Sequence, residues 1–188
     1  MGNRFVVPTP TPGGMTLISN TVASALSSLS LSSIPATYKN LMLTWHGINH
    51  SAGTSYFNIR LNNDSGANYS VKHIYKTSGT FTDNFYDGGT ELANNDSSPF
   101  GVDANVTDSF QRVRGYLIIE NYASTSLHKS ITGMWSNKLN SGSERTTMFI
   151  NSVYQSLSAV SSIDIFRQAG AATFSNAANT SIRLYGIS

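Results

Sequence analysis

The stretch SSIDIFRQAGAATFSNAANTSIRLYGIS, residues 161–188, decides the fold. Ile163 and Ile165 flank an acidic residue, and Ile182 and Leu184 flank an arginine. This period of two is typical of strands with one face in water, because successive side chains of a strand point to opposite faces. The residues between the two pairs are mostly Ala, Gly, Ser, Asn and Thr, which predicts a loop. We therefore expect two short strands here, the second of which closes a sheet.

Similar alternation recurs upstream, separated by turn-forming Asn, Ser, Gly and Pro residues. It predicts strands over residues 29–32, 39–47, 56–61, 69–76, 115–121, 130–136 and 146–155. About eight to ten short strands without a convincing long helix predict an all-β protein, a jelly-roll-like antiparallel β-sandwich. The inward positions of these strands form the predicted core, which comprises Leu41, Leu43, Trp45, Phe57, Ile59, Leu61, Ile118, Ile163, Ile165, Ile182 and Leu184.

The middle of the chain, residues 77–108, reads mostly as loop because Gly, Asn, Asp and Pro interrupt it repeatedly. A short helix is an alternative at its end, where residues 102, 106, 110 and 113 are apolar at helical spacing. Aromatic residues gather before and within this region, and they could line a sugar-binding surface or, as we favour, pack the loop onto the sandwich or a neighbour. They are Tyr56, Tyr69, Tyr75, Phe81, Phe85 and Tyr86.

Composition limits the classes of function. The chain has 188 residues, of which only 12% are charged and 29 are serine, so hydroxyls and amides must cover much of its surface. A net charge of +2 without a Lys/Arg cluster argues against a nucleic-acid partner. The absence of cysteine excludes disulfides and zinc–thiolate sites. Because no apolar run approaches the roughly 18–20 residues of a membrane span, we expect no membrane partner.

Residues 1–14 read as an extended N-terminal arm, separate from a single sandwich domain over residues 15–188. The arm combines a small apolar patch with prolines at every second position and then two glycines, and proline favours an extended backbone. A frayed terminus is one interpretation, and an arm that docks on another subunit is the other. The predicted partner-binding residues are Phe5, Val6, Val7, Pro8, Pro10 and Pro12.

No constellation of catalytic or metal-ligating residues stands out. His46 and His50 have a metal-ligand spacing for a helix, but four residues along a strand span about 13 Å, too far for one ion. Asp83, Asp87 and Glu91 recur every four residues, yet Gly88 and Gly89 would break a helix that aligned them, so we expect solvated loop carboxylates. We therefore predict no catalytic residues, no cofactor and no metal site.

Four segments resemble a group of tailed-bacteriophage virion proteins. They are IPATYKNLMLTW (34–45), NIRLNNDSGANYS (58–70), GYLIIENY (115–122) and SIRLYGIS (181–188), and the likeness extends from about residue 26 to the C-terminus. The group consists of jelly-roll decoration, head-fibre and tail-fibre-associated domains, many of them trimeric. The resemblance implies a structural role in the virion and carries over no active-site residues.

These observations favour a capsid decoration (cement) protein that binds and stabilises the major capsid shell, present on the virion and made in the bacterial host cytoplasm. We expect a homotrimer whose partners are the major capsid protein or other virion subunits. A tail-fibre or receptor- or glycan-binding module of the tail is the alternative. A glycan hydrolase would need two carboxylates about 5–10 Å apart in a groove, and the sequence indicates no such pair.

Overall fold

The computed structural model describes residues 13–22, 26–48, 57–77, 80–92, 113–138, 145–167, 173–174 and 181–188. Within these ranges every regular element is a β-strand. The strands are β1 (Met15–Thr21), β2 (Ser28–Leu31), β3 (Asn40–Ile48), β4 (Phe57–Leu61), β5 (Tyr69–Thr77), β6 (Thr80–Gly89), β7 (Val113–Glu120), β8 (Lys129–Lys138), β9 (Arg145–Tyr154), β10 (Ile163–Arg167) and β11 (Ser181–Ile187).

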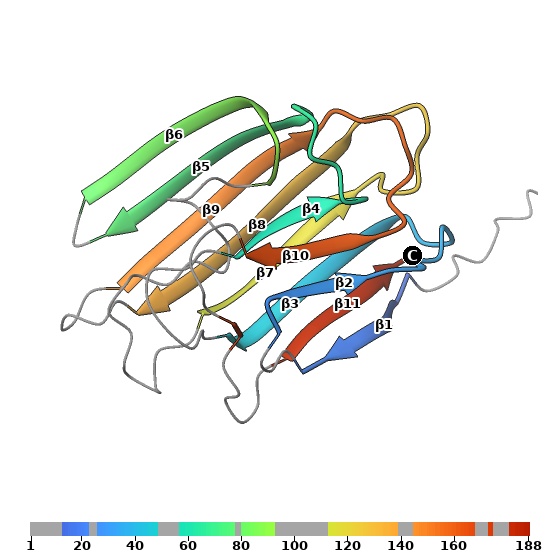
Figure 1. The fold of residues 1–188 in the computed structure, drawn as a ribbon, viewed down its shortest axis with the longest axis horizontal. Helices are drawn as coiled ribbons and strands as arrows, with labels where there is room; N and C mark the ends of the chain where they lie inside the picture. The colour runs from blue at the N-terminus through green and yellow to red at the C-terminus, as the bar shows by residue number, and fades with distance from the viewer. Residues whose placement is uncertain are drawn as a thin grey trace, which may run out of the picture.

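The strands form two antiparallel sheets. An eight-stranded sheet has the order β1-β11-β3-β7-β8-β9-β5-β6, and a three-stranded sheet has the order β2-β10-β4. In Figure 1 the three short strands lie in front of the long sheet, near its middle and the end that carries β1. The arrangement is a sandwich of unequal layers, so the fold is all-β and antiparallel as predicted, and it is compatible with jelly-roll wiring.

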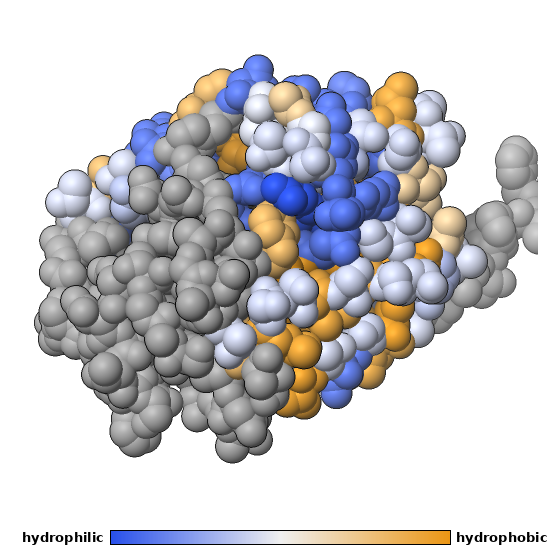
Figure 2. Space-filling model, in the orientation of Figure 1, coloured by the Kyte–Doolittle hydropathy of each residue, from blue (hydrophilic) through white to orange (hydrophobic). Residues whose placement is uncertain are grey.

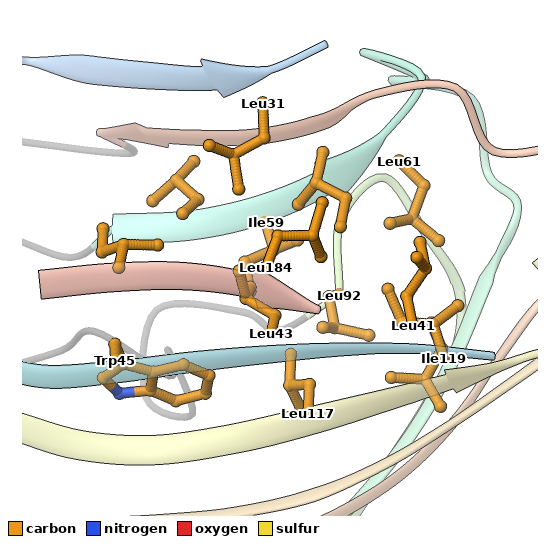
Figure 3. Close-up of a cluster of buried hydrophobic side chains, with 14 of the residues drawn as sticks. Leu31, Leu41, Leu43, Trp45, Ile59, Leu61, Leu92, Leu117, Ile119 and Leu184 are labelled. Atoms are coloured by element: carbon orange, nitrogen blue, oxygen red, sulfur yellow. The ribbon is translucent and has the colours of Figure 1, made fainter. Parts of the chain in front are cut away.

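The core fills the space between the two sheets. Leu31, Ile59 and Leu61 of the small sheet point toward apolar side chains of the large sheet (Figure 3). Those partners come from β3, β7 and β11, and they include Leu41, Leu43, Leu117, Ile119 and Leu184. Each of these side chains is nearly or fully buried, which is the condition under which an apolar side chain contributes its full 1.5–3 kcal/mol or so to stability.

The stretch from residue 161 to residue 188 joins the two layers. Its first strand, β10, pairs with β2 on one side and β4 on the other. Its second strand, β11, pairs with β1 and with β3. β10 therefore lies between β2 and β4, and β11 lies between β1 and β3. Each sheet thus needs a strand from the C-terminal stretch to join strands from the N-terminal part of the chain.

Most core predictions are confirmed. Nine of the eleven predicted core side chains are buried: Leu41, Leu43, Trp45, Ile59, Leu61, Ile163, Ile165, Ile182 and Leu184. Ile118 is wrong, because it lies half-buried on the opposite face of β7, while its neighbours Leu117 and Ile119 face the core. Phe57 begins β4, and its side chain lies outside the described residues.

Two further predictions need correction. The segment Thr80–Gly89 was expected to be loop, but it forms β6, which pairs with β5 at the margin of the large sheet. Glu91 was expected to be a solvated loop carboxylate, but it is buried beside Arg60. The alternative of a helix through residues 102–112 lies outside the described residues, and Val113 opens β7.

Candidate interaction surfaces

The large sheet has a second face, turned away from the small sheet, which we call the outer face. Cross-strand register places Tyr185, Met42 and Ile118 side by side on it, across β11, β3 and β7. The next rung continues through Tyr116, Met134, Phe149 and Ile74 on β7, β8, β9 and β5. Apolar side chains therefore form a band that crosses the outer face from β11 to β5.

The ends of this band are the most exposed. Leu17 on β1 is 52% exposed, Phe149 on β9 is 53% exposed, and Phe85 and Phe81 on β6 are 63% and 69% exposed. Within the described part of the chain, no strand or turn packs over them. Monomeric soluble proteins rarely expose contiguous apolar patches larger than a few hundred square ångströms. The outer face thus has the character of an interaction surface.

Several charged groups on the outer face are engaged locally, while Arg114 and Glu120 of β7 are exposed on the same face. Lys72 on β5 forms an ion pair with Asp83 on β6, with the Lys Nζ and Asp Oδ2 atoms 3.1 Å apart. The ammonium of Lys76 lies 4.9 Å from the centre of the Phe81 ring. Arg183 donates a hydrogen bond from Nε to Asn20 Oδ1 at 3.2 Å. A partner that covered Lys72, Lys76 or Arg183 would therefore desolvate charges that already have a local contact, which lowers the electrostatic cost of association at these positions.

A groove lies at the open side of the sandwich, where β1 and β11 of the large sheet diverge from β2. It encloses about 460 Å³ and is lined by Ile18, Ser19, Thr21, Ser30, Leu31, Ser32, Ser33, Pro35 and Leu184. Apolar side chains and small hydroxyl side chains alternate in this lining. Figure 2 shows hydrophobic surface interleaved with weakly polar surface over this lower part of the molecule.

The small sheet presents a different, hydrophilic surface over β4 and β10 (Figure 2). Arg60 donates to Glu91 Oε2 at 3.2 Å and stacks over the Phe166 ring, 4.1 Å from its centre. Asn58 donates to the other Glu91 oxygen at 3.2 Å. Burial raises the pKa of Glu91 despite the neighbouring Arg60, so this buried ion pair fastens the turn after β6 to β4.

A second polar cluster surrounds Asp64 in the turn after β4. Its carboxylate accepts hydrogen bonds from the Gly66 amide, the Asn68 side chain and the Tyr154 hydroxyl, at 2.7–2.8 Å. Burial raises the pKa of Asp64, but these hydrogen bonds outweigh it and hold the pKa below its usual value. The cluster joins the turn after β4 to β9, and the hydrogen bonds of the Asp64 carboxylate serve to hold this turn in place.

Lys129 is fully buried at the start of β8, which is rare for a lysine. Its ammonium donates to the backbone carbonyls of Ser124, Leu127 and Ser156 at 2.8, 3.2 and 3.0 Å. Burial lowers the pKa of Lys129. Each of the three N–H donors of the ammonium thus has an acceptor. The lysine links the turn between β7 and β8 to the turn after β9, and these contacts give it a structural role.

The histidines do not come together. His46 on β3 and His128 before β8 are exposed, His73 on β5 is buried, and His50 lies outside the described residues. Among the described residues, no three His, Asp or Glu side chains are grouped as ligands of a metal ion. The part of the chain that the structure describes also contains no helix long and apolar enough to cross a membrane.

The predicted aromatic cluster divides in two. Tyr69 is fully buried in β5 and packs on Tyr154, with ring centres 4.9 Å apart, so it belongs to the core of the sandwich itself and does not attach a loop to it. Phe81 and Phe85 are exposed on β6 and belong to the outer face. The side chains of Tyr56 and Tyr86 lie outside the described residues, as do the predicted partner-binding residues Phe5, Val6, Val7, Pro8, Pro10 and Pro12.

Sequence reasoning missed the outer face as a surface. The signal was present in GYLIIEN, which is apolar on both faces of its strand, and in Met42, Met134 and Phe149, which are apolar residues on the otherwise mostly polar faces of β3, β8 and β9. No protein-family model, no curated protein and no solved structure matches the chain. Inferences about its function therefore rest on these surfaces and on the resemblance described above.

Proposed function

We propose that the protein is a structural component of a tailed-bacteriophage virion, a capsid decoration protein that binds and stabilises the major capsid shell. The observation that carries this proposal is the apolar outer face of the large sheet, exposed from Leu17 at one margin to Phe85 at the other. The sequence resemblance to virion jelly-roll proteins supports the same role.

The outer face has the dimensions of a specific interface. Eight strands with spacings of about 4.8 Å, each with roughly nine residues of about 3.3 Å, give an area of about 1,000 Å². A stable interface of ordinary size buries about 800 Å² on each partner. We assign this face to the shell, because a broad sheet surface crossed by an apolar band matches an extended protein surface better than a small ligand, which needs a concave site.

The test measures occupancy of full-length protein on particles assembled without it. Phe85→Ser and Phe149→Ser together remove two exposed rings from the outer face, and each buried ring is worth about 1.5–3 kcal/mol. We expect the double variant to bind particles at least about tenfold more weakly than the unchanged protein. The matched control is Leu157→Ser, which changes a 49% exposed side chain in the turn between β9 and β10.

Electron microscopy of labelled protein gives the second readout. We expect label over the capsid surface. Label confined to the tail would support the alternative of a tail-fibre or receptor-binding module. Unchanged occupancy of the Phe85→Ser, Phe149→Ser variant would show that the outer face does not contact the shell.

A further inference from the structure

Three margins of the two sheets are open among the described residues. β1 pairs only with β11, β2 pairs only with β10, and β6 pairs only with β5. Unpaired strand edges invite an additional strand, because their N–H and C=O groups lack partners. At β1 and β2 the open edges coincide with the groove of about 460 Å³, so a strand added there would also contact the apolar Ile18, Leu31 and Leu184 among small hydroxyl side chains.

The N-terminal arm has the chemistry of such a strand. In an extended chain the N–H and C=O groups of successive residues point to opposite edges, so Pro8, Pro10 and Pro12 deprive one edge of three donors in succession. The other edge, formed by Val7, Thr9 and Thr11, keeps all its donors. The arm can therefore pair with a sheet through one edge only. No further strand could pair with its proline edge, so the arm would be the last strand of that sheet.

The connection of the arm to β1 disfavours the groove of the same chain. The amide of Ser188 donates to the Gly14 carbonyl at 3.2 Å, so Gly14 lies beside the end of β11, at the opposite end of β1 from the groove residues Ser19 and Thr21. To return, the arm would have to form a two-residue hairpin at Gly13 and Gly14. In such a hairpin the residues that flank the turn, and every second pair beyond, exchange both N–H···O bonds.

That register places the three prolines of the arm at the hydrogen-bonded positions, opposite Met15, Leu17 and Ser19. Each proline would forfeit one ladder bond, and each opposing carbonyl would lose its donor. A neighbouring copy is free of this constraint, because its arm can approach with the Val7–Thr11 edge. The sequence of the arm thus disfavours self-pairing and permits pairing between copies.

We propose that the arm of one copy adds as a strand to β1 of a neighbouring copy and places Phe5 and Val7 in the groove between β1 and β2. Phe5 and Val7 lie on one face of an extended arm, since they are two residues apart. The small side chains of Ser19 and Thr21 leave room beside Ile18 and Leu31 for them. The arm segment 5–11 matches the seven residues of β1 in length.

Arm exchange is a head-to-tail contact, and a closed ring of such contacts gives a homo-oligomer. The inference therefore rests on the proposed role in the virion and on the homotrimer expected from the sequence, and it supplies the contact that links the copies. A glycan is the competing occupant of a hydroxyl-lined groove. Among the described residues that line the groove there is no aromatic ring on which a sugar could stack. The groove does offer two strand edges to a peptide, so a peptide arm is favoured.

The test uses full-length protein without particles, so that it is independent of binding to the shell. Because the chain has no cysteine, Val7→Cys and Ser19→Cys introduce two unique thiols, which a short bismaleimide can join. We expect covalent species of two and three chains under denaturing conditions. Adding Phe5→Ser should remove most of this product, and Val7→Cys with Asp83→Cys, on the opposite margin at β6, should give none.

Two results would overturn the inference. A linked product that migrates as a single chain would show that the arm folds back on its own β1. Thiols that stay unlinked in a protein that sediments as a trimer would show that the copies associate without the arm, and protection of the Ser19 thiol by soluble oligosaccharides would then assign the groove to a glycan. Weak occupancy of particles with normal cross-linking would instead count against the proposed function alone.

Discussion

The inner and outer faces of the eight-stranded sheet are built from the same strands and differ in what covers them. Leu117 and Ile118 are neighbours on β7, and their side chains point in opposite directions. Leu117 is fully buried under the small sheet, and Ile118 is half-buried on the outer face. Two similar side chains at adjacent positions therefore differ in burial, because the small sheet covers only one face of the large sheet.

The comparison teaches how to separate stability from association in this protein. Apolar area removed from water within the chain stabilises the fold, at roughly 25 cal/mol for each square ångström. Apolar area left on the outer face contributes to the free energy only when a partner covers it. Substitutions on the inner face should therefore change the free energy of unfolding, and substitutions on the outer face should change binding.

The largest expected effect comes from truncation on the inner face. Leu117→Ala should lower the free energy of unfolding by about 2–5 kcal/mol, because it removes buried methyl groups and leaves a cavity between the sheets. Ile118→Ala is the matched variant on the outer face and should cost less than about 1 kcal/mol. Urea denaturation of purified protein measures both. Equal losses for the two variants would mean that something covers the outer face of the isolated protein.

Two lysines, the buried Lys129 and the exposed Lys72, allow a second comparison of the two faces. Lys129→Met leaves the part-buried carbonyls of Ser124, Leu127 and Ser156 without their shared donor, and we expect a loss of about 1–3 kcal/mol. Lys72→Met on the outer face breaks only an exposed ion pair with Asp83, for which we expect a change within about 0.5 kcal/mol. Thermal unfolding of both variants at neutral pH provides the measurement. A near-neutral Lys129→Met variant would disprove this account of the buried ammonium.

The smallest expected effect is a change of pH dependence at Tyr154, on the inner face of β9. Burial raises the pKa of Tyr154 to about 12 from its ordinary value of 10.0, with a contribution from the hydrogen bond to Asp64. Because the folded-state pKa is the higher one, the corresponding stability is present below pH 10 and is lost as the pH rises through about 12.

Tyr154→Phe should therefore cost about 1–2 kcal/mol at neutral pH, where its hydrogen bond to a carboxylate is lost, and should make the decline above pH 10 shallower. Tyr185→Phe on the outer face is the matched control and should keep the wild-type profile. Urea denaturation at several alkaline pH values measures the slope. An unaltered slope in Tyr154→Phe would assign the alkaline loss to other groups.

Several predictions from the sequence failed for identifiable physical reasons. The face of Ile118 could not be inferred, because GYLIIEN is apolar at consecutive positions and so carries no alternation. The strand β6 was missed, because Asp, Asn and Gly are poor strand formers, yet a marginal strand with one neighbour tolerates them. Glu91 is buried because Arg60 and Asn58, some thirty residues away, neutralise and hydrogen-bond it.

The sequence by itself determined that this chain is an antiparallel β protein and which residues form most of its core. Period-two alternation fixes which side chains of a strand share a face, and turn-forming residues fix where strands end. Only the tertiary structure decided the partners of each strand, such as the insertion of β11 between β1 and β3. Alternation is similar in every strand, so it holds no information on neighbours. The neighbours are selected by long-range packing, which leaves one face of the large sheet without a second layer of described strands.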